Sequence, residues 1–147
     1  MEEKIFIIVG MSGSGKSTAV EYLTRQGVPK VGPEQIAGEE IQKLMEAGQK
    51  QIVLDGIHNW DTYQQIKKEY AGKTTTIAIV APKAQRFHRV AGRTDHALST
   101  EEMQYHDHDD VVELGLGNVI AVADYYIMND GPMKNLCEQL DVIIKSV

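Results

Sequence analysis

The chain has 147 residues, a formal net charge of −6 at pH 7 and a single cysteine. This length suits one domain with a core of its own, and we expect a single domain over residues 1–147. The acidic balance argues against a general nucleic-acid binder, which neutralises backbone phosphates with a basic face. One cysteine cannot form an internal disulfide or a thiolate metal site. We therefore expect a reducing compartment and, at Cys137, a buried inert thiol rather than a nucleophile.

The first predicted element is a strand over the apolar run Ile5 to Val9, close to the N-terminus. This run is far too short for a secretory signal or a membrane span. We therefore predict a cytoplasmic protein without a membrane partner.

Residues 10–17 follow this strand directly, read GMSGSGKS and precede a helical run. They match the strand, G-x-x-x-x-G-K-[ST], helix pattern of a phosphate-binding loop, or P-loop. The glycines permit positive φ angles that turn successive N–H groups inward and form an anion site at the helix N-terminus. Lys16 supplies a charge for the β- and γ-phosphates of ATP, and the Ser17 hydroxyl can bind the bridging Mg²⁺. The nucleotide-binding residues predicted here are Gly13, Ser14, Gly15, Lys16, Ser17 and Thr18.

The alternative for this loop is a glycine-rich turn that carries Lys-Ser by chance and binds nothing. The flanking strand and helix favour the P-loop interpretation. ATP with Mg²⁺ is accordingly the predicted ligand of the chain.

The next stretch predicts a short strand, Val28 to Val31, followed by a single helix. Gly32-Pro33 starts that helix, since proline suits the first helical position, and Gly48 ends it. Its apolar residues fall on one face at helical spacing, which indicates a helix covering a sheet. These residues are Ile36, Ala37, Ile41, Leu44 and Met45.

The third predicted strand, Ile52 to Leu54, ends in Asp55-Gly56. A carboxylate at the tip of a buried strand beside the P-loop can hold Mg²⁺ directly or through water. The alternative is an Asp-Gly turn that only shapes the loop.

The helix that follows carries aromatic and apolar residues at three- and four-residue steps. Asn59 or Asp61 can cap its N-terminus. We expect Trp60 and Tyr63 to pack in this helix rather than to bind a ligand.

Thr74 to Val80 is the fourth predicted strand, and a helix runs from Pro82 to about Gly92. One face of this helix is apolar, and another carries three arginines. The apolar set is Ala84, Phe87, Val90 and Ala91, and the arginines are Arg86, Arg89 and Arg93. Because the arginines follow a strand tip, we expect at least one to face phosphate, and Arg86 can equally stack on adenine. The alternative is a solvated surface stripe.

Ser99 and Glu102 have the spacing of a capping box and open a polar helix toward Asp110. Residues 106–110 read HDHDD, which we interpret as a hydrated acidic helix surface, with a divalent-metal site as the alternative. Glycines at 115 and 117 break the chain before a helical turn at 119–123.

A fifth strand is predicted at Tyr125 to Met128, and an amphipathic last helix begins at Met133. The turn between them, Asn129-Asp130-Gly131-Pro132, lies where Asn129 and Gly131 can present backbone groups to a purine. A plain turn is the alternative.

The alternation of strands with helices of ten or more residues implies parallel pairing through right-handed crossovers. We predict an α/β chain with a three-layer α/β/α P-loop NTPase fold and a five-stranded parallel sheet of order 2-3-1-4-5. A ligand of such a sheet binds beyond the carboxyl ends of its strands. Gly10, Asp55, Pro82 and Asn129 all lie at those ends.

Five segments carry a resemblance that covers nearly the whole chain. They are the GMSGSGKST loop, Val53 to Ile57, the Ala81-Pro82 helix with Arg86-Phe87-x-Arg89, Gly115 to Ala121, and Ala123-Asp124-Tyr125 leading to Asn129. On these segments the chain resembles the nucleoside monophosphate kinase-like P-loop group. It is most similar there to small proteins named dephospho-coenzyme A kinase-like or adenylate kinase-related.

This resemblance implies roles for residues beyond the P-loop. A short lid segment at about 86–114 carries Arg86, Arg89 and Arg93 over ATP, and the loop from Asn129 forms the adenine edge. The acceptor side departs from the group. Asp55 follows Lys16 by only 39 positions, and His58 stands where relatives often place an arginine. The acceptor-binding region, about 28–50, is therefore expected to be reduced.

The resulting hypothesis is an ATP- and Mg²⁺-dependent phosphotransferase acting on a nucleotide or nucleotide-like small molecule. Lys16, Asp55, Arg89 and Arg93 are the predicted catalytic residues, and Ser17 with Asp55 is the predicted metal site. Glu34 is a further candidate for positioning an acceptor hydroxyl. The alternatives are a nucleotide-binding regulatory or sensor module without transfer, and a slow ATPase.

Overall fold

The fold is seen in a computed structural model that describes residues 2–36 and 38–147. Its five strands form one parallel sheet of order β2-β3-β1-β4-β5, which confirms the predicted topology. The strands are β1 (Lys4–Val9), β2 (Lys30–Val31), β3 (Gln51–Leu54), β4 (Thr74–Val80) and β5 (Tyr125–Met128). The helices are α1 (Lys16–Arg25), the 3₁₀ turn η1 (Pro33–Gln35), α2 (Glu40–Glu46), α3 (Trp60–Glu69), α4 (Lys83–Ala91), α5 (Thr100–Val112), α6 (Leu116–Ala121) and α7 (Met133–Ser146).

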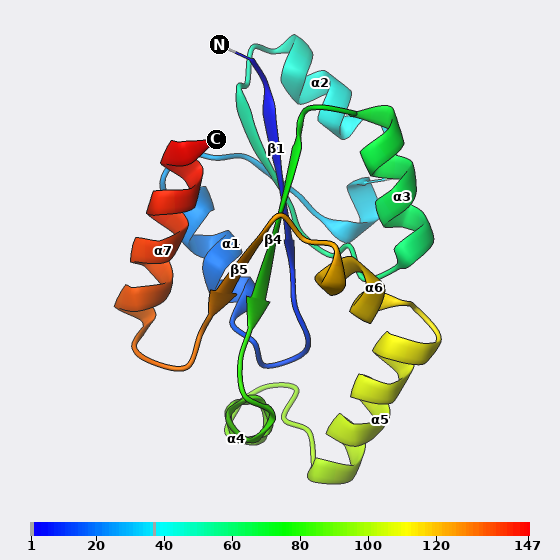
Figure 1. Cartoon of the computed structure of the whole chain (residues 1–147), viewed down its shortest axis with the longest axis vertical. Helices are drawn as coiled ribbons and strands as arrows, with labels where there is room; N and C mark the ends of the chain where they lie inside the picture. The colour runs from blue at the N-terminus through cyan, green and yellow to red at the C-terminus, as the bar shows by residue number, and fades with distance from the viewer. Residues whose placement is uncertain (1, 37) are drawn as a thin grey trace.

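Two layers of helices cover the two faces of the sheet. Side chains alternate along β1, so Ile5 and Ile7 point to one face while Phe6 and Ile8 point to the other, and all four are fully buried. The first face packs against α2, α3 and α6, and the second against α1 and α7, as Figure 1 shows. The central strands are buried on both faces, which is why they read as unbroken apolar runs.

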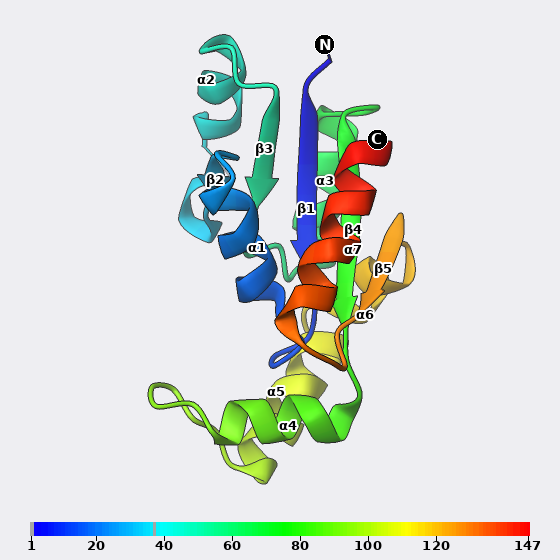
Figure 2. The ribbon, with the colours of Figure 1, turned by 90° about the vertical axis from the view of Figure 1, so that its left-hand side faces the viewer.

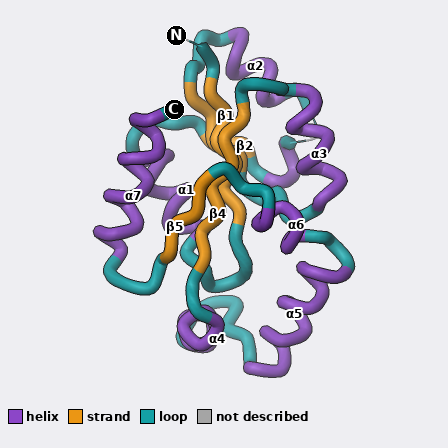
Figure 3. The backbone as a smooth tube through the Cα atoms, in the orientation of Figure 1, coloured by secondary structure: helices purple, strands orange, loops and turns teal. Residues whose placement is uncertain are grey.

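Helices α4 and α5 belong to neither layer. Figure 2 shows both of them beyond the carboxyl ends of the strands, across the end of the sheet where the P-loop lies. Both termini of the chain lie toward the opposite end of the sheet (Figure 3). The candidate site and these two helices therefore share one end of the molecule.

The single helix expected from Pro33 to Gly48 is wrong. The chain forms the 3₁₀ turn η1, a further turn in which the Gly38 amide donates to the Gln35 carbonyl (3.1 Å), and only then α2. A glycine inside a helix costs about 1 kcal/mol relative to alanine, and this one ends the first turn instead. The predicted apolar face does pack on the core, through Ile36, Ile41 and their neighbours Leu44 and Met45. Ala37 lies outside the described residues.

Local capping follows the sequence patterns closely. The Asn59 side chain accepts hydrogen bonds from the amides of Asp61 and Thr62 at the start of α3 (2.8 and 3.2 Å). Ser99 and Glu102 form the reciprocal capping box of α5. Trp60 and Tyr63 stack with ring centroids 5.8 Å apart, and Tyr63 is buried, which confirms their packing role.

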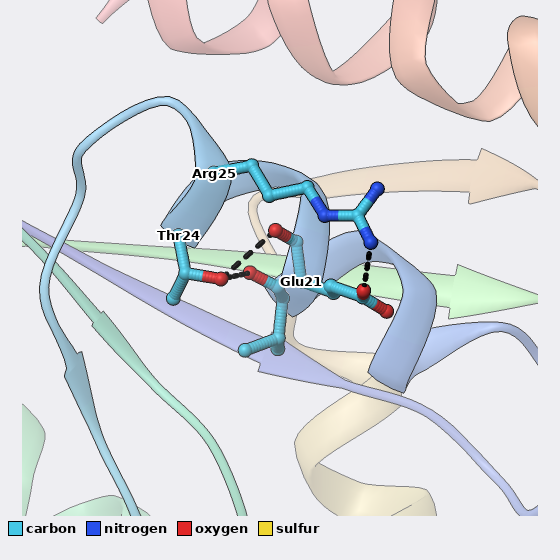
Figure 4. A network of polar contacts seen from close by, with 4 residues as sticks. Glu21, Thr24 and Arg25 are labelled. Carbon is cyan, nitrogen blue, oxygen red and sulfur yellow. Dashed lines mark hydrogen bonds and ion pairs between the residues drawn. The ribbon is translucent and has the colours of Figure 1, made fainter.

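The C-terminal end of α1 is closed by short-range contacts, shown in Figure 4. The Thr24 hydroxyl donates to the carbonyls of Val20 and Glu21 (3.2 and 2.8 Å), and the Arg25 guanidinium pairs with the Glu21 carboxylate one turn earlier. Both charged side chains are largely exposed, so the pair contributes at most about 0.5 kcal/mol. The opposite end of α1 has no comparable side-chain cap.

Two remaining expectations concern burial. Cys137 is half-buried rather than fully buried, and burial together with the nearby Asp141 carboxylate raises the pKa of its thiol. No helix within the described residues is long and apolar enough to cross a membrane.

Candidate functional site

The P-loop joins β1 to α1 and adopts the conformation that its glycines suggest. Gly13 and Gly15 have φ angles of 80° and 105°, and Gly15 occupies the N-cap position of α1 in the left-handed conformation. No side chain caps this helix end, so the first amides of α1 lack helical acceptors and remain available to an anion. A cavity of about 490 Å³ opens over them, lined by residues 11–18 with Arg89 and Arg93.

Lys16 is half-buried at the edge of this cavity. Among the described residues its ammonium forms no ion pair. Burial lowers the pKa of Lys16, and the charge of Arg93 lowers it further, while Asp55 and Asp110 act in the opposite direction. An incompletely compensated ammonium beside unpaired amides is suited to binding a polyphosphate.

Helix α4 rests directly on the P-loop. The carbonyl and Cα of Arg86 come so close to Gly13 that the loop has no room for a side chain there. The buried residues of α4 are Arg86 and Val90, whereas Ala84 and Ala91 of the predicted apolar face are exposed. The face prediction is therefore wrong in part, because this helix packs on polar loop backbone rather than on the sheet.

The Arg89 guanidinium holds the P-loop through its carbonyl oxygens. It donates to the carbonyls of Gly13 and Ser14 (3.0 and 3.4 Å), and also to the carbonyl of Asn129 (2.6 Å). Because these bonds use carbonyls, they leave the P-loop amides available, apart from the Ser14 amide, which donates to the Met11 carbonyl (3.0 Å). Arg89 lines the cavity as predicted, but most of its donors are used by the protein itself.

Arg86 makes a second link to the same loop. Its guanidinium donates to the Ser12 carbonyl (3.1 Å) and forms a bidentate pair with the Asp107 carboxylate (3.0 and 2.8 Å). The Arg86 side chain is 9% exposed and that of Asp107 is 17% exposed. One predicted role of Arg86 was to stack on adenine. In the structure its guanidinium is already hydrogen-bonded to Ser12 and Asp107.

The acidic run at 106–110 is the part of the site that sequence reasoning missed. Asp107 pairs with Arg86. Asp110 is half-buried, and its pKa is raised, chiefly by burial and also by the charge of Asp107, against the opposing effects of His106 and Lys16. The interpretation as a wholly hydrated surface is therefore wrong for these two carboxylates, although His106 and His108 are exposed. The spacing of three residues between Asp107 and Asp110, which places both on one face of α5, was the available signal.

The loop after β5 reaches the P-loop through Asn129. Its side-chain amide donates to the Ser14 carbonyl (2.9 Å), while its own carbonyl accepts from Arg89. Gly131 is exposed in the turn that follows and does not line the cavity. The predicted adenine edge is thus adjacent to the P-loop, with the Asn129 side chain engaged in positioning it.

A Mg²⁺ ion would be held by the oxygen ligands that this end of the sheet provides. Ser17 is exposed at the cavity, and Asp55 lies close enough to Lys16 to raise its pKa. The described residues contain no cluster of three or more acidic, histidine or cysteine side chains that would form a dedicated metal site. A hydroxyl and one carboxylate fit an ion that takes its other ligands from phosphate and water, as Mg²⁺ does.

The geometry has counterparts among known proteins, although no protein-family model matches the chain. A UPF0200 protein from Sulfurisphaera tokodaii is 29% identical, with 98% of this chain and 97% of the relative covered. Among solved structures, a sugar kinase from Janibacter sp. matches with a TM-score of 0.67 at 16% identity, covering 98% of this chain and 95% of that one. A shikimate kinase from Aquifex aeolicus matches with a TM-score of 0.60 at 16% identity, covering 96% of each chain.

The chain has the fold of the P-loop kinases. The alignment with the UPF0200 protein has 175 positions, which is 28 more than the 147 residues of this chain. The relative therefore contains residues that have no counterpart here.

Proposed function

We propose that the chain is a phosphotransferase that uses ATP as the donor and Mg²⁺ as the cofactor. The observation that carries this proposal is the cavity at the N-terminus of α1, where uncapped amides, Lys16 and two arginines converge. Such a set binds the charge of a triphosphate and stabilises the charge that develops on a transferred phosphoryl group. A Mg²⁺ ion held by Ser17 and near Asp55 would supply further positive charge to the same oxygens.

In this proposal the residues that line the cavity have different roles. The amides of Gly13 and of residues 15–18 and the Lys16 ammonium bind the β- and γ-phosphates, whereas the Ser14 amide donates to the Met11 carbonyl (3.0 Å). Arg93, exposed at the cavity, is the arginine free to reach the γ-phosphate, whereas Arg89 fixes the loop from behind. Arg93 is therefore better placed than Arg89 for the predicted catalytic role.

The acceptor is the less defined half of the proposal. The sequence resemblance favours a nucleotide or nucleotide-like small molecule, as in the dephospho-coenzyme A kinase-like or adenylate kinase-related proteins. Two fold neighbours are named as kinases of a sugar and of shikimate, which supports a small-molecule acceptor in general. We further propose that the protein acts in the cytoplasm, without a nucleic-acid or membrane partner.

A second candidate function is a nucleotide-binding regulatory module without transfer. The observation that favours it is that the alignment with the UPF0200 relative has 28 more positions than this chain has residues, which agrees with the sequence-based expectation of a reduced acceptor region at about 28–50. A slow ATPase differs from both because it would release phosphate with no acceptor present.

The test is an acceptor screen with ATP and Mg²⁺, with products identified by mass spectrometry. Lys16→Ala is expected to lower the transfer rate by about 10² to 10³-fold, as expected for loss of a preorganised charge. Lys134→Ala, an exposed lysine on α7, serves as the matched control and should retain the rate. Tight ATP binding without any phosphorylated product would favour the regulatory module, and phosphate release alone would favour the ATPase.

A further inference from the structure

A second cavity lies on the acceptor side of the P-loop. It has a volume of about 320 Å³ and is bounded by η1, the loop after β3, the start of α3 and the end of α5. The Trp60 amide donates to the Leu114 carbonyl (2.9 Å), and this bond fixes two of those walls to each other. Cavities that take small molecules begin at about 300 Å³, so this one suits a compact ligand.

The walls of this cavity carry no basic charge. Among the described residues that line it there is neither lysine nor arginine. Pro33, Ile36 and Leu114 provide an apolar side, and His58, Asn59 and Thr62 provide a polar side. A phosphate group of the acceptor would meet no cation among these lining residues, and an uncompensated anion in a partly enclosed site is disfavoured.

His58 connects this cavity to the P-loop. The side chain is half-buried, and burial lowers its pKa, as does the charge of Lys16, while Asp55 opposes the shift. His58 also follows the candidate metal ligand Asp55 by three residues, in the loop after β3 that borders the cavity. Its imidazole makes no hydrogen bond with any described residue and is therefore available to a ligand.

The predicted alternative for acceptor positioning has less support. Glu34 is exposed, and it does not line the cavity. The Asn59 side-chain oxygen is already occupied by the cap of α3, which leaves its amide group for a ligand. Thr62 offers a hydroxyl on the same wall.

We propose that this cavity is the acceptor site, that it takes a compact, uncharged, hydroxyl-bearing molecule such as a sugar or polyol rather than a phosphorylated one, and that His58 accepts the hydrogen bond of the reacting hydroxyl. This inference rests on the proposed phosphotransferase function and replaces the nucleotide acceptor favoured by the resemblance. In the step, the acceptor oxygen bonds to the γ-phosphorus and the bond to the β,γ-bridging oxygen breaks. ADP departs with that electron pair, and the hydroxyl proton passes along its hydrogen bond to His58 and then to water.

The experiment offers matched pairs of acceptors to the full chain with ATP and Mg²⁺. Each pair consists of a phosphate-free compound and its monophosphate, for example a hexose, a pentitol and a nucleoside with their phosphates, and products are read by mass spectrometry. The expected result is transfer to phosphate-free members only. Preferential transfer to the monophosphates would overturn the acceptor assignment and leave the phosphotransferase proposal intact. No transfer to any member, with ATP still bound, would overturn both.

Substitutions at His58 test its role separately. His58→Phe keeps a ring but removes its nitrogens, and we expect kcat/KM for the acceptor to fall by about 10²-fold while the Kd for a non-hydrolysable ATP analogue stays unchanged. His58→Arg adds the missing cation and should improve the relative use of the phosphorylated members. His108→Phe, at an exposed histidine of α5, is the control. Equal acceptor kcat/KM in His58→Phe and the control would exclude the proposed role of His58.

Discussion

The two halves of the candidate site are built in different ways, although they share one end of the sheet. On the donor side, Arg86, Arg89 and Asn129 reach the P-loop from distant parts of the chain and hydrogen-bond to three of its carbonyls. On the acceptor side, a short 3₁₀ turn and the start of α3 border a smaller cavity without basic residues among the described ones. Phosphate binding thus depends on a loop backbone that side chains from other parts of the chain hold in place. The choice of acceptor depends on a few side chains without a basic charge.

The largest effect on the donor side is expected from Asp107→Ala. It leaves the buried Arg86 guanidinium without its carboxylate, so the free energy of unfolding should fall by about 3 kcal/mol, and ATP affinity should weaken because α4 holds the P-loop. Chemical denaturation and ATP titration measure the two effects. Glu101→Ala, exposed on the same helix, is the control, and an equal stability in both variants would contradict a structural role for the ion pair.

The matching change on the acceptor side is Ile36→Ala. Ile36 is 6% exposed, packs on the core and also lines the acceptor cavity, so we expect a loss of about 2 kcal/mol in unfolding free energy. ATP affinity should not change, because the side chain does not border the P-loop cavity. Val142→Ala, an exposed aliphatic residue, provides the reference. A fall in ATP affinity would show that the two halves are not independent.

A smaller loss is expected from Asn129→Ala on the donor side. The change removes one hydrogen bond to the Ser14 carbonyl and should reduce the unfolding free energy by about 1 kcal/mol, with weaker ATP binding. Asn135→Ala, at an exposed position of α7, tests for nonspecific effects. Unchanged ATP binding would mean that the P-loop does not need this contact.

The smallest effect is expected at the end of α1 remote from the site. Arg25→Ala removes an exposed pair with Glu21 and should cost less than about 0.5 kcal/mol without changing ATP affinity. Thermal unfolding measures the change in stability and ATP titration measures the affinity. Lys145→Ala, at an exposed position of α7, is the control. A loss larger than about 0.5 kcal/mol would show that this exposed pair contributes more to stability than its exposure predicts.

The elements of the sheet were predictable because their signals are local. Each of the five predicted strands overlaps an observed strand, and the capping residues Asn59 and Ser99 have the roles that their spacing predicts. The break within the predicted helix at 33–48 was less accessible. There, Pro33 and Gly38 favour a break, whereas the apolar residues keep a helical spacing throughout. In the folded chain these apolar residues pack on the core from two separate segments, η1 with Ile36 and α2.

The candidate site was predictable only in part, since motif spacing identifies ligand types but not their neighbours. Gly13, Gly15 and Lys16 lie around one cavity as the P-loop pattern predicts. The hydrogen bonds of Arg86 to Asp107 and of Arg89 to the loop carbonyls could not be predicted from helical periodicity. Periodicity shows which residues share a helix face but not which residues that face contacts.

The sequence by itself determined the strand-helix alternation and the P-loop, because each depends on residues within a few positions of one another. The parallel sheet followed from that alternation, because a helix that connects two neighbouring strands returns the chain in the same direction. Only the tertiary structure decided that α4 and α5 lie over the P-loop (Figure 2), that Asp107 pairs with Arg86, and that His58 borders a cavity lined by no lysine or arginine among the described residues. Those arrangements depend on contacts between residues far apart in the chain, whose partners are fixed by packing and burial rather than by local spacing.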